Sequence, residues 1–212
     1  MLEFYAQHFD TVELNNTFYR LPTENGLTTW RESTPKGFCF AAKGSRFITH
    51  LKKLKDPESA IEKYFERVCQ LGKKLGPIVF QLPPWWEADA ARLEAFLDAL
   101  PRRRLYAFEL RNPTWHTPEI RRILHRRNAA FCVFEIAGFR SGFDITADFT
   151  YVRLHGPGGA YQGSYPREAL KEWASRIRKW QKDVRAVYVY FDNDQAGFAV
   201  RNALELKQLL TS

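Results

Sequence analysis

The sequence predicts an α/β protein whose parallel strands close into a barrel. Three observations lead to this prediction. Short β-branched and aromatic runs recur along the chain, helical segments lie between most of them, and each run carries a polar residue in its second half. No linker rich in Ser, Gly or Pro interrupts the alternation, so we expect a single domain over residues 1–212.

Seven runs are expected to form strands, because β-branched and aromatic residues favour extended structure. They span residues 11–19, 37–44, 77–84, 104–112, 129–136, 149–156 and 186–193.

Helical periodicity is clearest over residues 57–75 and 166–182, where apolar residues recur on one stripe. Asp56 followed by Pro57 is typical of a capped helix start. Further helices are expected over 87–100, 117–128 and 196–211, with a shorter one at 25–32. The stretch from Ile136 to Phe149 has no helical pattern. Such alternation of strands and helices indicates a parallel sheet.

The polar residues of the strands favour a closed barrel over an open sheet. In residues 151–155, Val152 and Leu154 face one way while Arg153 and His155 face the other. Both faces of an open doubly wound sheet are covered by helices, so its strands read as nearly continuous apolar runs. We therefore predict a TIM-type (β/α) barrel with seven strands in this chain and a ligand site at their carboxyl ends. The inward charges would nearly balance, with carboxylates at Glu13, Glu109, Glu135 and Asp192 and cations at Lys43, Arg111 and Arg153.

Composition limits the class of protein. No apolar run approaches the roughly 18 residues of a membrane span, and the N-terminus does not resemble a secretory signal. The three cysteines are widely spaced, which argues against a disulfide framework and a zinc ribbon. We expect a cytoplasmic protein. The net charge of +8 permits nucleic-acid partners without requiring them, and we place most of it on the surface where strands begin.

Three residues are candidates for catalysis. Glu109 ends a strand and could act as a base, His155 could act as a general acid or base, and Lys43 could bind an anion or act as a nucleophile. Each has a structural alternative: an internal ion-pair network for Glu109 and Lys43, and a satisfied core histidine for His155.

A larger set is expected to bind the ligand, because its members lie at or just after strand ends. For Asn15 and Tyr19 the alternative is a role in the turn, for Trp115 it is packing, and for Asp192 and Asn193 it is capping of the last helix, for which Asp194 is the stronger candidate. Tyr161 lies in a glycine-rich loop that is not a P-loop. The set comprises Glu13, Asn15, Tyr19, Gln81, Arg111, Trp115, Arg153, Tyr161, Tyr190, Asp192 and Asn193.

A divalent metal is possible but not favoured. Glu13, His50, Glu109, His155 and Asp192 are suitable ligand types, yet no HxH or HExxH spacing is present. We assign no metal ligands, and the sequence does not identify a cofactor. The sequence does not determine the oligomeric state.

Several stretches together resemble the domain of unknown function 72 family. They are HFDTVELNNTFYRLP, KLGPIVFQLPP, FELRNPTW, ADFTYVRLHG and VYVYFDNDQAGFAVRNALEL, in the family's order and over nearly the whole chain. The resemblance implies a TIM-type barrel and brings no assigned reaction. Members of that family usually begin with a further strand containing a Gly-Thr-Ser-Gly-Trp-like run, which this chain lacks, so we expect seven strands where a full barrel has eight.

Three functional hypotheses follow. The first is an enzyme that binds a small polar or anionic ligand, carrying phosphate or carboxylate, through Lys43, Arg111, Arg153 and His155. The second is a nucleic-acid-processing phosphodiesterase, which would need basic residues near the mouth of the barrel. The third is a binding protein without catalysis, in which the polar ring is structural.

Overall fold

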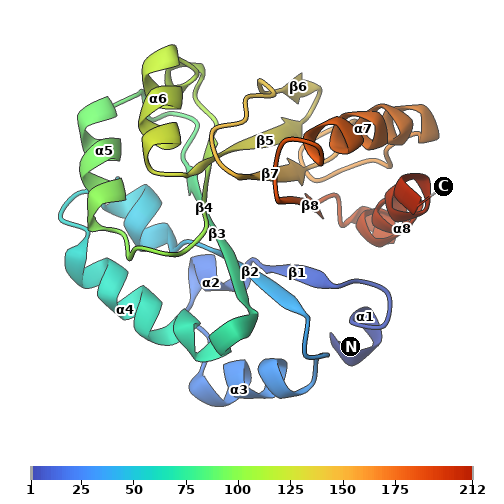
Figure 1. Cartoon of the computed structure of the whole chain (residues 1–212), viewed down its shortest axis with the longest axis horizontal. Coiled ribbons are helices and arrows are strands. Elements are labelled where there is room, and N and C mark those ends of the chain that lie inside the picture. Colours follow the sequence, from blue (N-terminus) through green and yellow to red (C-terminus); the bar gives the residue numbers. More distant parts are fainter. Residues whose placement is uncertain (1, 212) are drawn as a thin grey trace. The chain divides into compact units, whose positions relative to one another are not determined.

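The computed structural model describes residues 2–211, and its packing divides the chain into two compact units, residues 1–129 and 130–212. Each unit is built from parallel strands followed by helices, as the alternation of the sequence predicts (Figure 1). The prediction of one domain over residues 1–212 stays a prediction.

The first unit is built on four parallel strands in the order of the chain. They are β1 (Thr11–Leu14), β2 (Cys39–Lys43), β3 (Leu75–Leu82) and β4 (Tyr106–Leu110). The helices of this unit are α1 (Leu2–Tyr5), α2 (Asn16–Tyr19), α3 (Glu24–Glu32), α4 (Glu58–Val68), α5 (Ala90–Ala99) and α6 (Pro118–Arg126). A π-helical turn (Phe47–Leu51) follows β2, and 3₁₀ turns span Cys69–Lys74 and Pro113–Trp115.

The second unit contains β5 (Ala130–Ile136), β7 (Phe149–Leu154) and β8 (Ala186–Phe191), which are parallel, with β7 in the middle. The short strand β6 (Phe139–Arg140) pairs antiparallel with β5. Helices α7 (Arg167–Trp180) and α8 (Phe198–Thr211) lie side by side (Figure 1). A 3₁₀ turn (Gln195–Gly197) precedes α8.

All seven predicted strands are present, and two boundaries, one of a strand and one of a helix, differ most from the expectations. The first strand ends at Leu14 and a helical turn follows, where the pattern predicted strand to residue 19. The Thr17 hydroxyl lies 2.7 Å from the carbonyls of Leu14 and Lys43, which stabilises that turn. The helix predicted over 57–75 ends at Val68, because the following 3₁₀ turn leads through Gly72 at φ +60° into β3.

The segment without a helical pattern, between Ile136 and Phe149, contains the β5–β6 hairpin instead of a helix. Its two turn residues, Ala137 and Gly138, both have positive φ (49° and 81°). Positive φ at both central positions is typical of a tight hairpin turn that follows the twist of its strands.

The core of the first unit is aromatic. The Phe80 ring packs edge-on against Phe96 with centroids 5.0 Å apart, and lies 5.5 Å from Phe108. All three side chains are fully buried. A Cβ atom at Gly44 would lie 2.3 Å from the Phe80 ring, so a glycine is required where β2 ends. This packing fixes the end of β2, and with it the position of Lys43.

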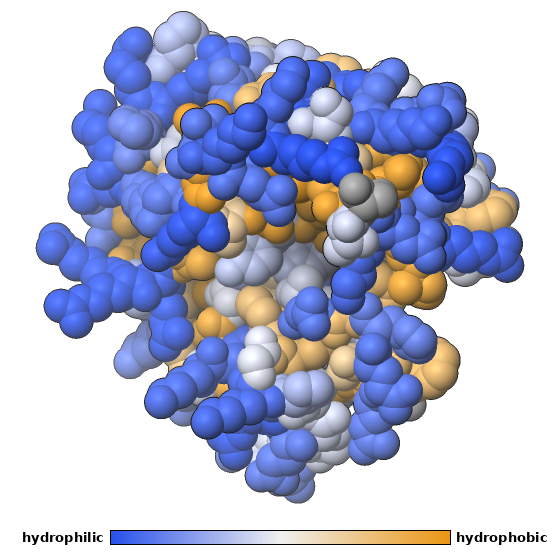
Figure 2. Space-filling view, turned by 45° about the vertical axis from the view of Figure 1, so that its right-hand side comes forward, coloured by the Kyte–Doolittle hydropathy of each residue, from blue (hydrophilic) through white to orange (hydrophobic). Residues whose placement is uncertain are grey.

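Hydrophilic residues cover most of the face shown in Figure 2, as expected of a chain with 32 Lys and Arg residues. Among residues 2–211, no helix combines the length and the apolar character that a membrane span requires. None of the three cysteines is in a disulfide.

Candidate functional site

Strand register brings four predicted site residues to one face of the first unit's sheet. Gln81 pairs with Glu109, and Lys43 pairs with Val79, which shares a face with Gln81. Glu13 pairs with Ala41, which shares a face with Lys43. Paired residues of parallel strands point to the same side, so Glu13, Lys43, Gln81 and Glu109 lie on one face, near the carboxyl ends of their strands.

Lys43 is held at the end of β2 by its neighbours. Its carbonyl accepts hydrogen bonds from the hydroxyls of Thr17 (2.7 Å) and Tyr64 (3.1 Å). Its ammonium lies 4.4 Å from the centroid of the Phe18 ring, and the residue is only 8% exposed. A buried ammonium over an aromatic face is a fixed positive charge in an environment that screens it poorly.

Glu109 and Arg111 form an ion pair at the end of β4. The Arg111 Nε donates to Glu109 Oε1 at 2.5 Å, and the Glu109 side chain is fully buried. The carboxylate therefore orients the guanidinium, as in the ion-pair interpretation of these residues. The role of Glu109 as a catalytic base stays a prediction.

The pKa of His50, in the π-helical turn after β2, reflects the burial and the charges of this region. Burial and the positive charges of Lys43, Arg46 and Arg111 together lower the pKa of its imidazole to about 4. The Phe18 ring packs edge-on against the imidazole at 5.1 Å, and Nδ1 lies 2.9 Å from the Thr49 hydroxyl. His50 is therefore neutral at pH 7. Three cations act on this one side chain, which indicates a region of positive potential at the carboxyl ends of β2 and β4.

We call this group the Lys43 cluster (Lys43, Arg46, His50, Glu109 and Arg111), and three other predicted residues of the first unit are not members of it. Tyr19 is 78% exposed, and Asn15 is exposed in the turn after β1. Trp115 is fully buried, and its Nε1 donates to the Trp86 carbonyl at 2.8 Å. Its indole therefore packs in the interior and does not line an open mouth, which is the packing alternative.

In the second unit, three predicted residues meet at the ends of β7 and β8. Arg153 lies 2.8 Å from Asp192 through its Nη2, and His155 Nδ1 lies 3.2 Å from the same carboxylate oxygen. Arg153 Nη1 is 3.5 Å from His155 Nε2. A carboxylate thus faces Nδ1 and a guanidinium faces Nε2, so the two ring nitrogens have different partners. All three residues are less than 10% exposed.

The glycine-rich loop after β7 is held closely against the strand end. Tyr161 N donates to the His155 carbonyl at 2.6 Å, and Gly156 N donates to the Tyr165 hydroxyl at 3.1 Å. The Tyr161 ring packs edge-on against the His155 ring at 5.4 Å. Burial raises the pKa of Tyr165, which keeps its hydroxyl protonated at neutral pH. The loop thus covers His155.

Asn193 ties this loop to the end of the chain. Its Nδ2 donates to the Gly163 carbonyl (2.8 Å) and to Asn202 Oδ1 (2.9 Å) in α8, and Asn202 Oδ1 also accepts from Tyr165 N. Asn193 and Asn202 therefore fasten the loop, and neither caps α8. Asp194 takes the cap position before the 3₁₀ turn without a capping hydrogen bond from its side chain. Burial, together with the charge of Asp192, raises the pKa of Asp194.

The structure contradicts the inward placement of Glu135. Register pairs Glu135 with Leu154, whereas Arg153 pairs with Phe134 and Tyr190, so Glu135 lies on the opposite face of the sheet from Arg153. Its carboxylate accepts from Arg140 Nε in β6 at 2.6 Å. The residues around Glu135 are apolar on both faces of β5, so alternation alone did not determine which way it points.

Two residues of the Lys43 cluster were not among the predicted site residues. Arg46 and His50 lie in or beside a π-helical turn, which has neither a 3.6-residue nor a two-residue period. The sequence does place both residues directly after the strand that ends at Lys43, and this position is the signal that could have identified them. Within residues 2–211, no three His, Cys, Asp or Glu side chains gather in a way that could hold a metal ion.

Comparison with known proteins identifies relatives along the whole chain. The family model described as "Protein of unknown function DUF72" matches residues 1–212. UPF0759 protein YunF of Bacillus subtilis (strain 168) is 24% identical over 99% of this chain and 86% of its own length. UPF0759 protein YecE of Escherichia coli (strain K12) is 34% identical over 113 residues, which is 53% of this chain and 42% of YecE. That match spans less than half the length of YecE.

Solved structures share the fold. A DUF72 family protein of Enterococcus faecalis V583 (EF0366) superposes with a TM-score of 0.90 at 20% identity, covering 100% of this chain and 88% of the other. A DUF72 family protein of Thermotoga maritima MSB8 (TM1631) gives 0.82 at 25% identity, covering 96% and 85%. These likenesses confirm the predicted fold class, an α/β fold of the TIM-barrel type with seven parallel strands within residues 2–211. The family match and its relatives show that the chain belongs to the DUF72 family of proteins of unknown function.

Proposed function

We propose that this protein binds a small anionic ligand, bearing phosphate or carboxylate, at the carboxyl ends of β2 and β4. The observation that carries the proposal is the gathering of positive charge around the half-buried His50, whose pKa is lowered by burial and by Lys43, Arg46 and Arg111. These three charges add to the effect of burial on the imidazole, and the positive potential that they create also attracts an anion. The carboxyl ends of barrel strands are also where ligand sites form in this architecture.

Each member of the Lys43 cluster has a separate role in this proposal. Lys43 supplies a fixed charge, because β2 and the Phe18 ring hold its ammonium in place. Arg111 supplies a planar guanidinium whose orientation is set by Glu109. His50 stays neutral and contributes a hydrogen-bonding ring nitrogen without adding charge. Arg46 is exposed, and its positive charge attracts an incoming anion from solvent.

The proposal is tested by calorimetric titration of the full chain with inorganic phosphate and citrate, comparing Lys43→Met with Lys63→Met. Lys63 lies on the exposed side of α4, so both variants lose one positive charge but only one loses it from the cluster. Methionine keeps the length and the apolar stem of Lys43, which protects the fold. We expect Lys43→Met to weaken anion binding about tenfold or more, since a charge-assisted contact contributes about 1.5–3 kcal/mol. Equal affinities in the two variants would exclude Lys43 from the site.

A second variant tests the guanidinium. Arg111→Lys retains the charge and loses the planar group that Glu109 orients. We expect weaker binding of phosphate with an unchanged melting temperature. Full retention of affinity would mean that Arg111 acts only as a charge, and that the ion pair with Glu109 has a structural role alone.

A further inference from the structure

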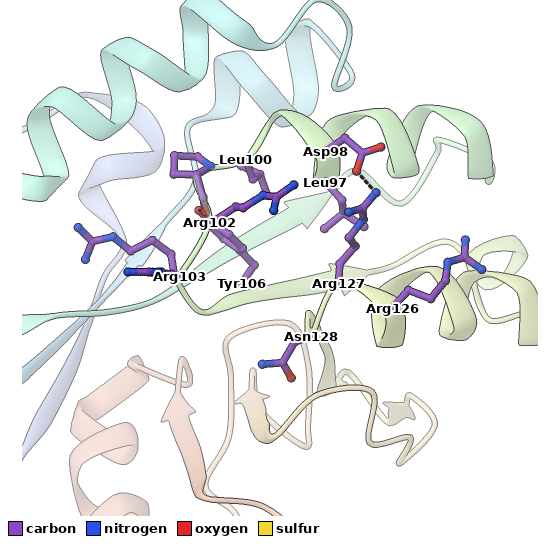
Figure 3. Close-up of a pocket in the computed structure, with 11 residues that line it drawn as sticks. Leu97, Asp98, Leu100, Arg102, Arg103, Tyr106, Arg126, Arg127 and Asn128 are labelled. Carbon is purple, nitrogen blue, oxygen red and sulfur yellow. Dashed lines mark hydrogen bonds and ion pairs between the residues drawn. The ribbon is translucent and has the colours of Figure 1, made fainter.

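We propose a second anion site at the opposite end of β4, which binds a small molecule carrying two or more linked phosphates. The site is a pocket of about 540 Å³ in the first unit (Figure 3). Five arginines line it: Arg102, Arg103, Arg104, Arg126 and Arg127. A volume of this size is within the usual range for small-molecule sites.

The pocket is separate from the Lys43 cluster. Arg102, Arg103 and Arg104 precede Tyr106, the first residue of β4, whereas Glu109 and Arg111 lie at the other end of that strand. A strand of this length spans about 15 Å. The two sites therefore face opposite ends of the first unit's sheet, and a ligand at one does not touch the residues of the other.

The charge of the pocket is strongly unbalanced. Asp98 is the one carboxylate among the lining residues, and it forms an ion pair with Arg127. Figure 3 shows Arg127 turned toward Asp98, while Arg126 points away from that pair. Arg126 pairs instead with Glu94 at 2.6 Å. No hydrogen bond or ion pair to Arg102 or Arg103 is found within residues 2–211, and both side chains are exposed.

The arginines of this pocket could stabilise the end of a helix or bind an anionic ligand. Arg126 ends α6 and Arg127 follows it directly, where positive charge also stabilises the helix C-terminus. Arg102 and Arg103 lie in the loop between α5 and β4, so that explanation does not extend to them. Arg103 also has φ +65°, a conformation that glycine adopts freely and that strains an arginine backbone. The chain thus carries a guanidinium at a position where local backbone energetics favour glycine or asparagine.

The chemistry of the ligand follows from the lining. Guanidinium groups bind phosphate through paired hydrogen bonds, and all five cations are arginine. One phosphate carries too little charge to balance several guanidinium groups, whereas linked phosphates carry more and span a larger part of the pocket. Leu97, Leu100 and Tyr106 supply an apolar wall for the rest of such a molecule. The Tyr106 hydroxyl donates to the Pro101 carbonyl at 2.7 Å, which fixes that wall beside the arginine loop.

The test is calorimetric titration with inorganic pyrophosphate at about 0.1 M ionic strength, where exposed charges more than about 10 Å apart are screened. The background is Lys43→Met, which weakens binding at the other anion site. Arg103→Gly removes the guanidinium and relieves the positive φ, so the fold is retained or stabilised. Asp98→Asn removes the carboxylate that competes for Arg127. Lys63→Met is the control for loss of one charge elsewhere.

We expect Arg103→Gly to weaken pyrophosphate binding about tenfold. We expect Asp98→Asn to tighten it roughly threefold, because Arg127 becomes available to the ligand. Lys63→Met leaves the affinity unchanged. Equal losses in Arg103→Gly and Lys63→Met, or no pyrophosphate binding by the Lys43→Met background, would overturn the proposal. Tighter binding of a single-stranded oligonucleotide than of pyrophosphate, lost in Arg103→Gly, would overturn the assignment to a small molecule.

Discussion

Arg153 and Asp192 form a buried ion pair that joins the ends of β7 and β8 in the second unit. Their 2.8 Å contact brings a guanidinium that is 1% exposed against a carboxylate that also faces His155. Each charge is tolerated in the interior because the other is present. The polar residues at this end of the second unit therefore stabilise the fold in the first place. They can take part in chemistry only where a ligand contacts them.

Asp192→Asn is expected to destabilise the protein by about 3 kcal/mol or more, because it leaves the buried Arg153 charge without its carboxylate. Replacing both residues with apolar ones of similar size, as in Arg153→Met with Asp192→Leu, should cost less than the single change. Urea denaturation measures both. The control is Glu168→Gln, which breaks the exposed pair with Lys171 and should cost about 0.5 kcal/mol or less. A single variant as stable as that control would show that the buried pair contributes nothing.

Gly156→Ala tests how firmly the loop is fixed over His155. Gly156 has φ +110°, and a Cβ atom there would lie 2.2 Å from the Gln162 carbonyl oxygen. We expect a loss of about 2 kcal/mol or more, from backbone strain and the clash. Gly158→Ala in the same loop is the matched control, because a Cβ atom there meets nothing within 4 Å. Thermal denaturation at the same temperature for both variants would show that the loop does not require a glycine at position 156.

His50 makes stability depend on pH in a defined direction. Its pKa is about 4 in the folded protein and about 6.5 when unperturbed, so between these values the unfolded chain binds more protons. The contribution of His50 to stability is therefore fully present above pH 6.5 and is lost as the pH falls toward 4. His50→Gln should flatten the pH dependence of the denaturation midpoint within this window. A slope that is identical in both proteins would show that the imidazole is not shielded from protons as described.

Much of the fold was predictable because the local sequence pattern of most segments agrees with the structure that they adopt. Every predicted strand exists, and the alternation in β2, β3 and β4 correctly placed Lys43, Gln81 and Glu109 on one face. Boundaries were less predictable. The turn at Asn16–Tyr19 depends on the Thr17 hydroxyl reaching the Lys43 carbonyl, a contact between residues 26 positions apart that no local pattern reveals.

The candidate site was harder to predict than the fold. Glu135 was placed on the wrong face, because β5 is apolar on both sides and its alternation carries little information. Arg46 was missed, and His50 was considered only as a metal-ligand type, because a π-helical turn has no sequence period. The basic residues at 102–104 and 126–127 were interpreted as surface charge, and they lie at the predicted end of the strands. That five of them line one pocket follows only from how the loop before β4 and the end of α6 are folded.

Anion binding at the Lys43 cluster is tested most directly by the pKa of His50. It is measured by NMR, first in the free protein and then with saturating inorganic phosphate. His50→Gln identifies its resonance among the five histidines. We predict a pKa of about 4 in the free protein, and a clear rise when an anion offsets the charges of Lys43, Arg46 and Arg111. A pKa near 6.5 in the free protein, or one that phosphate leaves unchanged, would contradict an anion site at the ends of β2 and β4.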